Sequence, residues 1–271
     1  LSLTICILYF FSVSSSPKVP EIANYWGEDG SFYTLCGKVW AEGGIPYVDI
    51  FEQKGPIIFL IYKIGYILSP VWGLFAIQCG FLWIAFVCSY FIAKEMVGVL
   101  KGIIASLVTM AFYVFVMDEW ALTEDFNLPF LMFSTYLIIK YLLSNNKVVS
   151  HPAKYAFVYG VTCGISLGLR LTNCVAICGF ILPICLMLFI NKQYKNILQN
   201  MMSFLLGFML IVLPFVIYFA ANGALYDLTW GTLLYNMYYA GVAASLGHSL
   251  HEWLKIVIYL LPIIICCILA F

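Results

Sequence analysis

Long apolar runs, separated by short polar segments, dominate the chain. These runs cover residues 3–13, 71–93, 102–117, 128–143, 155–169, 173–190, 201–221 and 254–271. A helix needs about 20 residues to cross a hydrocarbon core about 30 Å thick, and most of the runs approach that length. The period-two alternation of membrane-barrel strands is absent. The pattern predicts an all-α polytopic membrane protein.

One apolar run, residues 57–69, is too short for a clear crossing and is interrupted by Lys63. If it lies on the membrane surface, a set of lysines falls on one side with Glu95 as the only acid there. These lysines are Lys94, Lys101, Lys140, Lys147, Lys154, Lys192 and Lys195. The positive-inside rule favours this layout. We therefore expect an interfacial helix there, and outer loops at about 14–70, 118–127 and 222–253.

The composition agrees with a membrane protein. Hydrophobic residues make up 64% and charged residues 10% of the chain, whereas a soluble domain has about 25% charged residues. The formal net charge of +0 gives no reason to expect nucleic acid as a partner. The sequence starts at Leu1 and stops at Phe271 inside apolar runs, so we interpret residues 1–271 as one module of a longer protein, truncated at both ends.

The first outer loop carries the first candidate site, Glu28 and Asp29. Acids there could begin a helix, where the dipole favours negative charge. Alternatively, a carboxylate at the membrane surface could act as a general base. Cys36 lies in the same loop, and we expect it to react with thiol reagents added from outside. The other cysteines lie in apolar runs and have no metal-type spacing.

Further along this loop, the segment PYVDIFEQKGP leads into the apolar run 57–69. Pro56 suits the first turn of a helix, which puts Lys54 at the mouth of that helix. Lys54 either extends toward lipid headgroups or forms an anion site with the helix N-terminus. We take Tyr47 and Asp49 of this segment as candidate substrate-binding residues.

Two later features complete the candidate site. The segment DEWALTED supplies Glu124 and Asp125, either as part of a solvated connector or as pocket carboxylates that bind sugar hydroxyls or a divalent ion. Arg170 is the only arginine of the chain. Its planar guanidinium suits phosphate, although an arginine at a helix end can also reach to headgroups.

The segment GHSLHEW places His248, His251 and Glu252 close together, but the order differs from the HExxH zinc motif. Interfacial residues are the simpler interpretation, so no metal site is predicted. No cofactor is indicated with certainty, and a divalent cation held by the outer acids is the one left open.

The order of these motifs resembles the GT-C glycosyltransferases, in the branch that holds protein O-mannosyltransferases and the bacterial aminoarabinose transferase of lipid A. The resemblance rests on the acidic pair, on GIPYVDIFEQKGP, on the second acidic loop and on GISLGLRLT. It covers the chain from the first loop to about Asn173. The segment KGPIIFLIY resembles the family's lysine-Pro-Pro-Leu segment, with Gly55 replacing the first proline, and the acidic pair appears in reversed order.

The resemblance implies a GT-C-like helix bundle and a specific reaction. A sugar passes from a polyprenyl-phosphate carrier to a hydroxyl of a glycan, lipid or protein, with inversion, on the outer face of the cytoplasmic membrane. Asp29, with Glu28 beside it, would be the catalytic base. Lys54 and Arg170 would stabilise the leaving phosphate.

Two other functional classes remain open. A transporter or flippase of lipid-linked sugars would have charges at mid-membrane and broken helices in two matching halves, and neither is visible. An envelope glycan polymerase is closer in chemistry but normally has its main outer loop late in the chain. A purely structural subunit would not need so many acids and lysines within 27–65.

Overall fold

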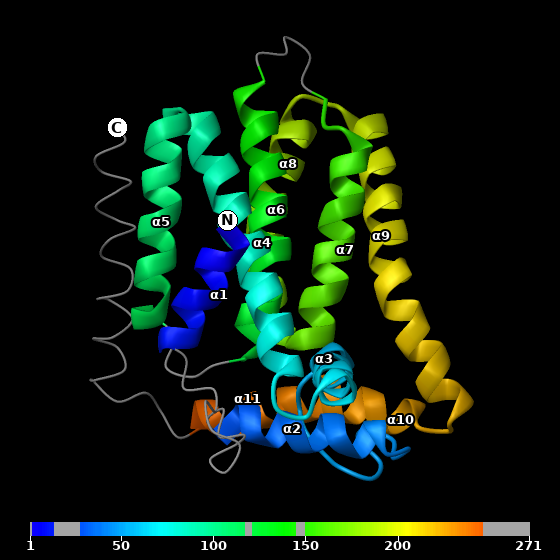
Figure 1. Cartoon of the computed structure of the whole chain (residues 1–271). Coiled ribbons are helices and arrows are strands. Elements are labelled where there is room, and N and C mark those ends of the chain that lie inside the picture. Colours follow the sequence, from blue (N-terminus) through cyan, green and yellow to red (C-terminus); the bar gives the residue numbers. More distant parts are fainter. Residues whose placement is uncertain (1, 14–27, 117–120, 145–149, 246–271) are drawn as a thin grey trace.

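The computed structural model describes residues 2–13, 28–116, 121–144 and 150–245, and these ranges contain helices but no strand (Figure 1). Among them, 4 helical stretches are long and apolar enough to cross a membrane. They are α4 (Gly73–Val97), α6 (Thr123–Leu143), the stretch Leu171–Ile190 and α9 (Tyr194–Ala221). The protein is therefore an all-α membrane protein. The predicted run 254–271 and the GHSLHEW segment lie outside the described residues.

Shorter helices complete the bundle beside these four (Figure 1). They are α1 (Ser2–Val13), α5 (Val99–Val116) and α7 (Ala153–Leu169), while Leu171–Ile190 consists of the short η2 (Leu171–Asn173) followed by α8 (Cys174–Ile190). The helix α4 packs on α1, α5 and α6, and α7 packs on α6, α8 and α9. The chain thus forms two neighbouring helix groups joined through α6 and α7.

Glycines allow the closest contact in the bundle, between α7 and α9. A Cβ at Gly160 would lie 2.0 Å from the carbonyl oxygen of Phe204, and one at Gly207 would lie 2.1 Å from that of Phe157. Helices in lipid gain little from apolar burial, so small residues that admit the neighbouring backbone stabilise their association.

A second set of helices lies across one end of the bundle (Figure 1). It consists of α2 (Glu28–Ala41), α3 (Pro56–Leu68), α10 (Leu225–Thr229), η3 (Trp230–Leu234) and α11 (Tyr235–Ser245). Pro56 occupies the first turn of α3, as predicted. Since α3 crosses the bundle instead of running along it, its orientation agrees with the layout that the charges favoured for residues 57–69.

The two ends of the bundle differ in charge. We call the end covered by α2, α3, α10 and α11 the acidic end, because every carboxylate of the described residues except Glu95 lies in segments there. We call the opposite end the basic end. Its lysines are Lys94, Lys101, Lys140, Lys154, Lys192 and Lys195. This separation of charge agrees with the topology expected from the sequence.

Candidate functional site

A tight turn positions the loop between α2 and α3 at the acidic end. Tyr47 has a positive φ of 69°, and its amide donates to the carbonyl of Ile50 at 2.8 Å. The Asp49 carboxylate accepts the amide of Ile45 at 2.6 Å. The Tyr47 ring is buried between Phe59 and Phe219. The structure therefore places Tyr47 and Asp49 as supports of the turn, with the Asp49 side chain at the surface.

The end of this loop is fixed against the C-terminal end of α7. The Gly55 amide donates to the carbonyl of Leu169 at 3.0 Å. A Cβ at Gly55 would lie 2.3 Å from the carbonyl oxygen of Gly168, so the approach requires glycine. The Tyr47 hydroxyl donates to the Lys54 carbonyl at 2.7 Å. These contacts hold the peptide group between Lys54 and Gly55 through both its carbonyl and its amide.

Lys54 forms the centre of a buried charge cluster. The residue is only 6% exposed. Its Nζ lies 3.6 Å from Asp29 Oδ2 and 3.8 Å from Glu52 Oε1. The Tyr33 hydroxyl donates to the same Asp29 oxygen at 2.9 Å. Because 54% of the Asp29 side chain is exposed, the cluster can be reached from solvent through Asp29.

Burial also changes the titration of the groups around Lys54. It raises the pKa of Glu52, an effect that the Lys54 ammonium and the Gln53 amide oppose. Burial and the negative charge of Asp29 raise the pKa of Tyr33 well above its usual value. Tyr33 therefore remains a neutral hydrogen-bond donor to Asp29 at physiological pH.

A second ion pair lies on segments that adjoin the loop carrying Lys54, because Gly55 bonds to Leu169. Arg170 Nη1 donates to Glu124 Oε1 at 3.1 Å, and the Thr123 hydroxyl donates to the other Glu124 oxygen at 2.8 Å. Arg170 directly follows Leu169, the residue that receives the Gly55 amide. The structure thus brings Asp29 to Lys54, and Glu124 to Arg170, on two segments that touch each other.

Asp125 occupies a different environment, inside the bundle. It is 1% exposed, and its oxygens accept hydrogen bonds from Gln78 Nε2 at 2.7 Å and from the Tyr113 hydroxyl. The carboxylate therefore ties α4, α5 and α6 together. This placement gives no support to the expectation that Asp125 contacts a substrate. Gln78 was not predicted, although an amide inside an apolar run was the available signal.

Three further residues of the first loop differ in their roles. Glu28 is exposed in the first turn of α2, the position that favours acids at a helix start. Glu52 was not predicted, although its place two residues before Lys54 was a visible signal. The structure does not favour the expected reaction of Cys36 with thiol reagents, because the residue is 1% exposed and burial raises its pKa to about 12.

Two polar side-chain atoms are buried without a hydrogen-bond partner among the described residues. They are Gln53 Oε1 and Asn173 Nδ2. Buried polar atoms are normally satisfied, so such atoms call for an explanation. Gln53 precedes Lys54, and its carbonyl accepts Asn236 Nδ2 from α11 at 2.7 Å.

An apolar groove of about 160 Å³ lies between α3, α7, α9, α10 and η3, and Pro56, two residues after Lys54, is among the residues that line it. Its only hydroxyls, on Thr229 and Thr232, donate to carbonyls of the preceding helical turn. The groove therefore presents almost pure hydrocarbon, and the chain leads from Lys54 to its wall at Pro56.

Neither a group of metal ligands nor a known relative identifies the function of the site. In the described ranges, no three His, Cys, Asp or Glu side chains are grouped to hold a metal ion. Comparison with protein-family models, curated proteins and solved structures gave no match to the chain. The resemblance to GT-C enzymes consequently rests on the motif residues alone.

Proposed function

We propose that this protein is a membrane glycosyltransferase that moves a sugar from a polyprenyl phosphate to a hydroxyl acceptor on the extracytoplasmic side. The observation that carries the proposal is Lys54, a buried cation that contacts a partly exposed carboxylate and that precedes by two residues Pro56, which lines an apolar groove. A lipid-linked phosphate has the matching parts, an anion joined to a hydrocarbon chain.

The donor phosphate would bind by competing for Lys54. In the structure, the ammonium is shared between Asp29 and Glu52 at 3.6 and 3.8 Å, distances longer than a good charge-assisted hydrogen bond. A phosphate at Lys54 would draw the ammonium away from Asp29 and free that carboxylate for the acceptor. The first isoprene units would follow Pro56 into the groove.

The chemical step assigns one role to each group. Asp29 takes the proton of the acceptor hydroxyl while its oxygen forms a bond to the anomeric carbon. The bond from that carbon to the phosphate oxygen breaks, and the electron pair leaves with the phosphate. Lys54 stabilises the developing charge, with Arg170 as a second cation once phosphate replaces Glu124 as its partner. Glu28 and Asp49 remain at the rim of the site.

The test is sugar transfer by the full-length protein in detergent, supplied with radiolabelled polyprenyl-phosphate sugars and candidate acceptors. Transfer is expected for the wild type and for Lys38→Ala, a matched control at the same end whose lysine is exposed and pairs with Glu42. Asp29→Asn is expected to abolish transfer while its thermal stability stays close to that of wild type. Full transfer by Asp29→Asn would remove it as the base.

The same preparation distinguishes the transporter alternative. In proteoliposomes, a flippase would move the labelled lipid between leaflets without releasing its sugar to any acceptor. Leaflet exchange that requires Lys54, in the absence of transfer, would replace the proposed activity by transport.

A further inference from the structure

Of the two carboxylates that contact Lys54, Glu52 has no role in the reaction proposed above. Its Oε1 lies 3.8 Å from Lys54 Nζ and accepts the Gln53 amide at 2.9 Å. Glu52 and Lys54 lie in the same loop between α2 and α3, whereas Asp29 lies in the first turn of α2. The pair Lys54–Glu52 is therefore formed within the loop, and the pair Lys54–Asp29 connects the loop to a helix.

The two carboxylates also differ in their surroundings. The Glu52 side chain is 20% exposed, against 54% for that of Asp29. Burial raises the pKa of the Cys36 thiol to about 12, and the negative charge of Glu52 adds to this increase, so the thiol lies near the carboxylate. Because charges interact more strongly where water is excluded, and the distances to Nζ are similar, Glu52 is the stronger partner of Lys54.

A buried ammonium keeps its proton only beside negative charge, because burial favours the neutral amine. In the proposed reaction, Asp29 takes the proton of the acceptor and becomes neutral, while the phosphate draws Lys54 away from it. Asp29 therefore cannot keep Lys54 charged through the whole cycle. Glu52 transfers no proton in that reaction, so its negative charge stays next to Lys54 throughout.

We propose that Glu52 is a positioning residue, which keeps Lys54 protonated and directed at the donor phosphate while Asp29 changes its charge. The role in transfer rests on the proposed function, whereas the pairing of charges does not. The dependence is mutual. Burial raises the pKa of Glu52, and the Lys54 ammonium and the Gln53 amide oppose this effect, so each group of the pair keeps the other ionised.

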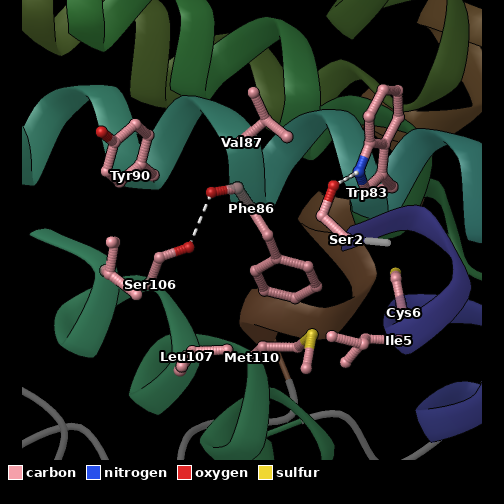
Figure 2. Close-up of a pocket in the computed structure, with 11 residues that line it drawn as sticks. Ser2, Ile5, Cys6, Trp83, Phe86, Val87, Tyr90, Ser106, Leu107 and Met110 are labelled. Atoms are coloured by element: carbon pink, nitrogen blue, oxygen red, sulfur yellow. Dashed lines mark hydrogen bonds between the residues drawn. The ribbon is translucent and has the colours of Figure 1, made fainter.

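Polar groups elsewhere in the bundle are satisfied without charge. Figure 2 shows a cavity of about 300 Å³ between α1, α4 and α5. There Trp83 Nε1 donates to Ser2 Oγ, and the Ser106 hydroxyl donates to the Phe86 carbonyl. The described residues that line this cavity include no charged side chain. Neutral partners suffice for these groups, whereas the buried ammonium of Lys54 requires an anion.

The first test measures the neutral amine of Lys54 without donor or acceptor. The full-length protein in detergent is labelled briefly with acetic anhydride at pH 8, and mass spectrometry gives the acetylated fraction of each lysine. Glu52→Gln is expected to raise labelling of Lys54 about tenfold, because loss of an adjacent carboxylate moves the proton equilibrium by about one pH unit. Glu42→Gln removes the exposed partner of Lys38 and should change labelling of Lys38 less than about twofold.

Asp29→Asn separates the effects of the two carboxylates and of access by the reagent. It removes the more exposed partner on the open side of the cluster, so labelling of Lys54 should rise less than about twofold. A rise in Asp29→Asn equal to that in Glu52→Gln would overturn the proposal. If Glu52→Gln does not fold, a tenfold rise in Asp29→Asn alone would overturn it as well, and a rise below twofold would support it.

The second test measures the consequence for sugar transfer. Glu52→Gln is expected to lower kcat about tenfold and to bring the alkaline fall of the rate to a pH about one unit lower. Glu52→Asp keeps the charge and should restore the wild-type pH profile. A lower kcat with an unchanged pH profile would show a merely structural role and overturn the proposal. If the wild type transfers no sugar, the proposed function fails, and labelling still decides whether Glu52 keeps Lys54 charged.

Discussion

The two ends of the bundle use charge in opposite ways. At the acidic end, Lys54 is buried between Asp29 and Glu52, and Arg170 is paired with Glu124. At the basic end, the lysines are exposed and the buried titratable group is His151, held by neutral partners. A buried ammonium loses its hydration and needs close partners, whereas an exposed lysine needs none. The acidic end therefore contains a network of ion pairs with fixed geometry, whereas the basic end contains exposed lysines that act through their summed charge.

The two ends therefore differ in role. Residues of the Lys54 network are positioned to take part in a reaction, whereas the exposed lysines orient the protein in the membrane. Positions in the Lys54 network are constrained by Gly55, Tyr47 and Tyr33, so a change at one of them alters the others. Exposed lysines of the basic end are independent of one another and act together through their summed charge.

The largest expected effect comes from removing the buried cation. Lys54→Ala should lower sugar transfer by about 10²–10³-fold, because it removes a preorganised charge at the leaving phosphate. Lys195→Ala should leave the rate within about twofold of wild type, since an exposed lysine stabilises no developing charge. Initial rates at saturating donor measure both. Comparable losses in the two variants would show that the ends do not differ in the proposed way.

A large loss of stability is expected from the buried carboxylate of the acidic end. Asp125→Ala leaves Gln78 and Tyr113 without their acceptor, which costs about 1–3 kcal/mol for each unsatisfied group. Asp49→Ala, which removes an exposed turn contact, should cost about 1 kcal/mol or less. Thermal unfolding in detergent compares the two. A stability of Asp125→Ala equal to that of Asp49→Ala would argue against a structural role for the buried network.

The sequence predicted the fold well where composition alone decides it. Apolar runs located the long helices, and the charges of the short loops distinguished α3 from the spanning helices. Details that depend on packing were not predictable. Cys36 lies in a polar stretch of the sequence, yet it is 1% exposed, because its burial depends on the segments that pack on α2.

Some residues of the candidate site could likewise be predicted from the sequence, and others depend on packing. Lys54 and Asp29 were proposed from residue type and motif order, and the structure brings them together. Glu52 and Tyr33 complete the cluster through contacts between a loop and a helix, which no spacing rule describes. Asp125 and Glu124 are adjacent in sequence, yet one points into the bundle and the other to Arg170. A helix start turns neighbouring side chains about 100° apart, so sequence adjacency does not imply a shared pocket.

Disrupting the contact between the Gly55 loop and α7 is expected to have an intermediate effect on stability and transfer. Gly55→Ala would place a Cβ 2.3 Å from the Gly168 carbonyl oxygen, and the resulting displacement should cost about 1–3 kcal/mol. It should also reduce transfer, because Lys54 moves with the loop. Gly241→Ala, whose Cβ would meet no atom within 4 Å, is the matched control and should be neutral. Equal stability and activity of the two variants would contradict the proposed anchoring.

The smallest effect is expected at the basic end, as a dependence of stability on pH. Burial lowers the pKa of His151 below its usual value of 6.5, an effect that the hydrogen bond to Asn200 partly opposes. The unfolded chain therefore binds a proton at a higher pH than the folded protein does. Stability from this residue is present above pH 6.5 and is lost as the pH falls through that value toward the folded pKa.

A pH series of thermal unfolding with His151→Gln tests this directly. Glutamine does not titrate and can still contact Asn200, so the variant should lose part of the decline in melting temperature below pH 6.5 that the wild type shows. Identical slopes for wild type and variant would mean that His151 is not buried in the neutral form.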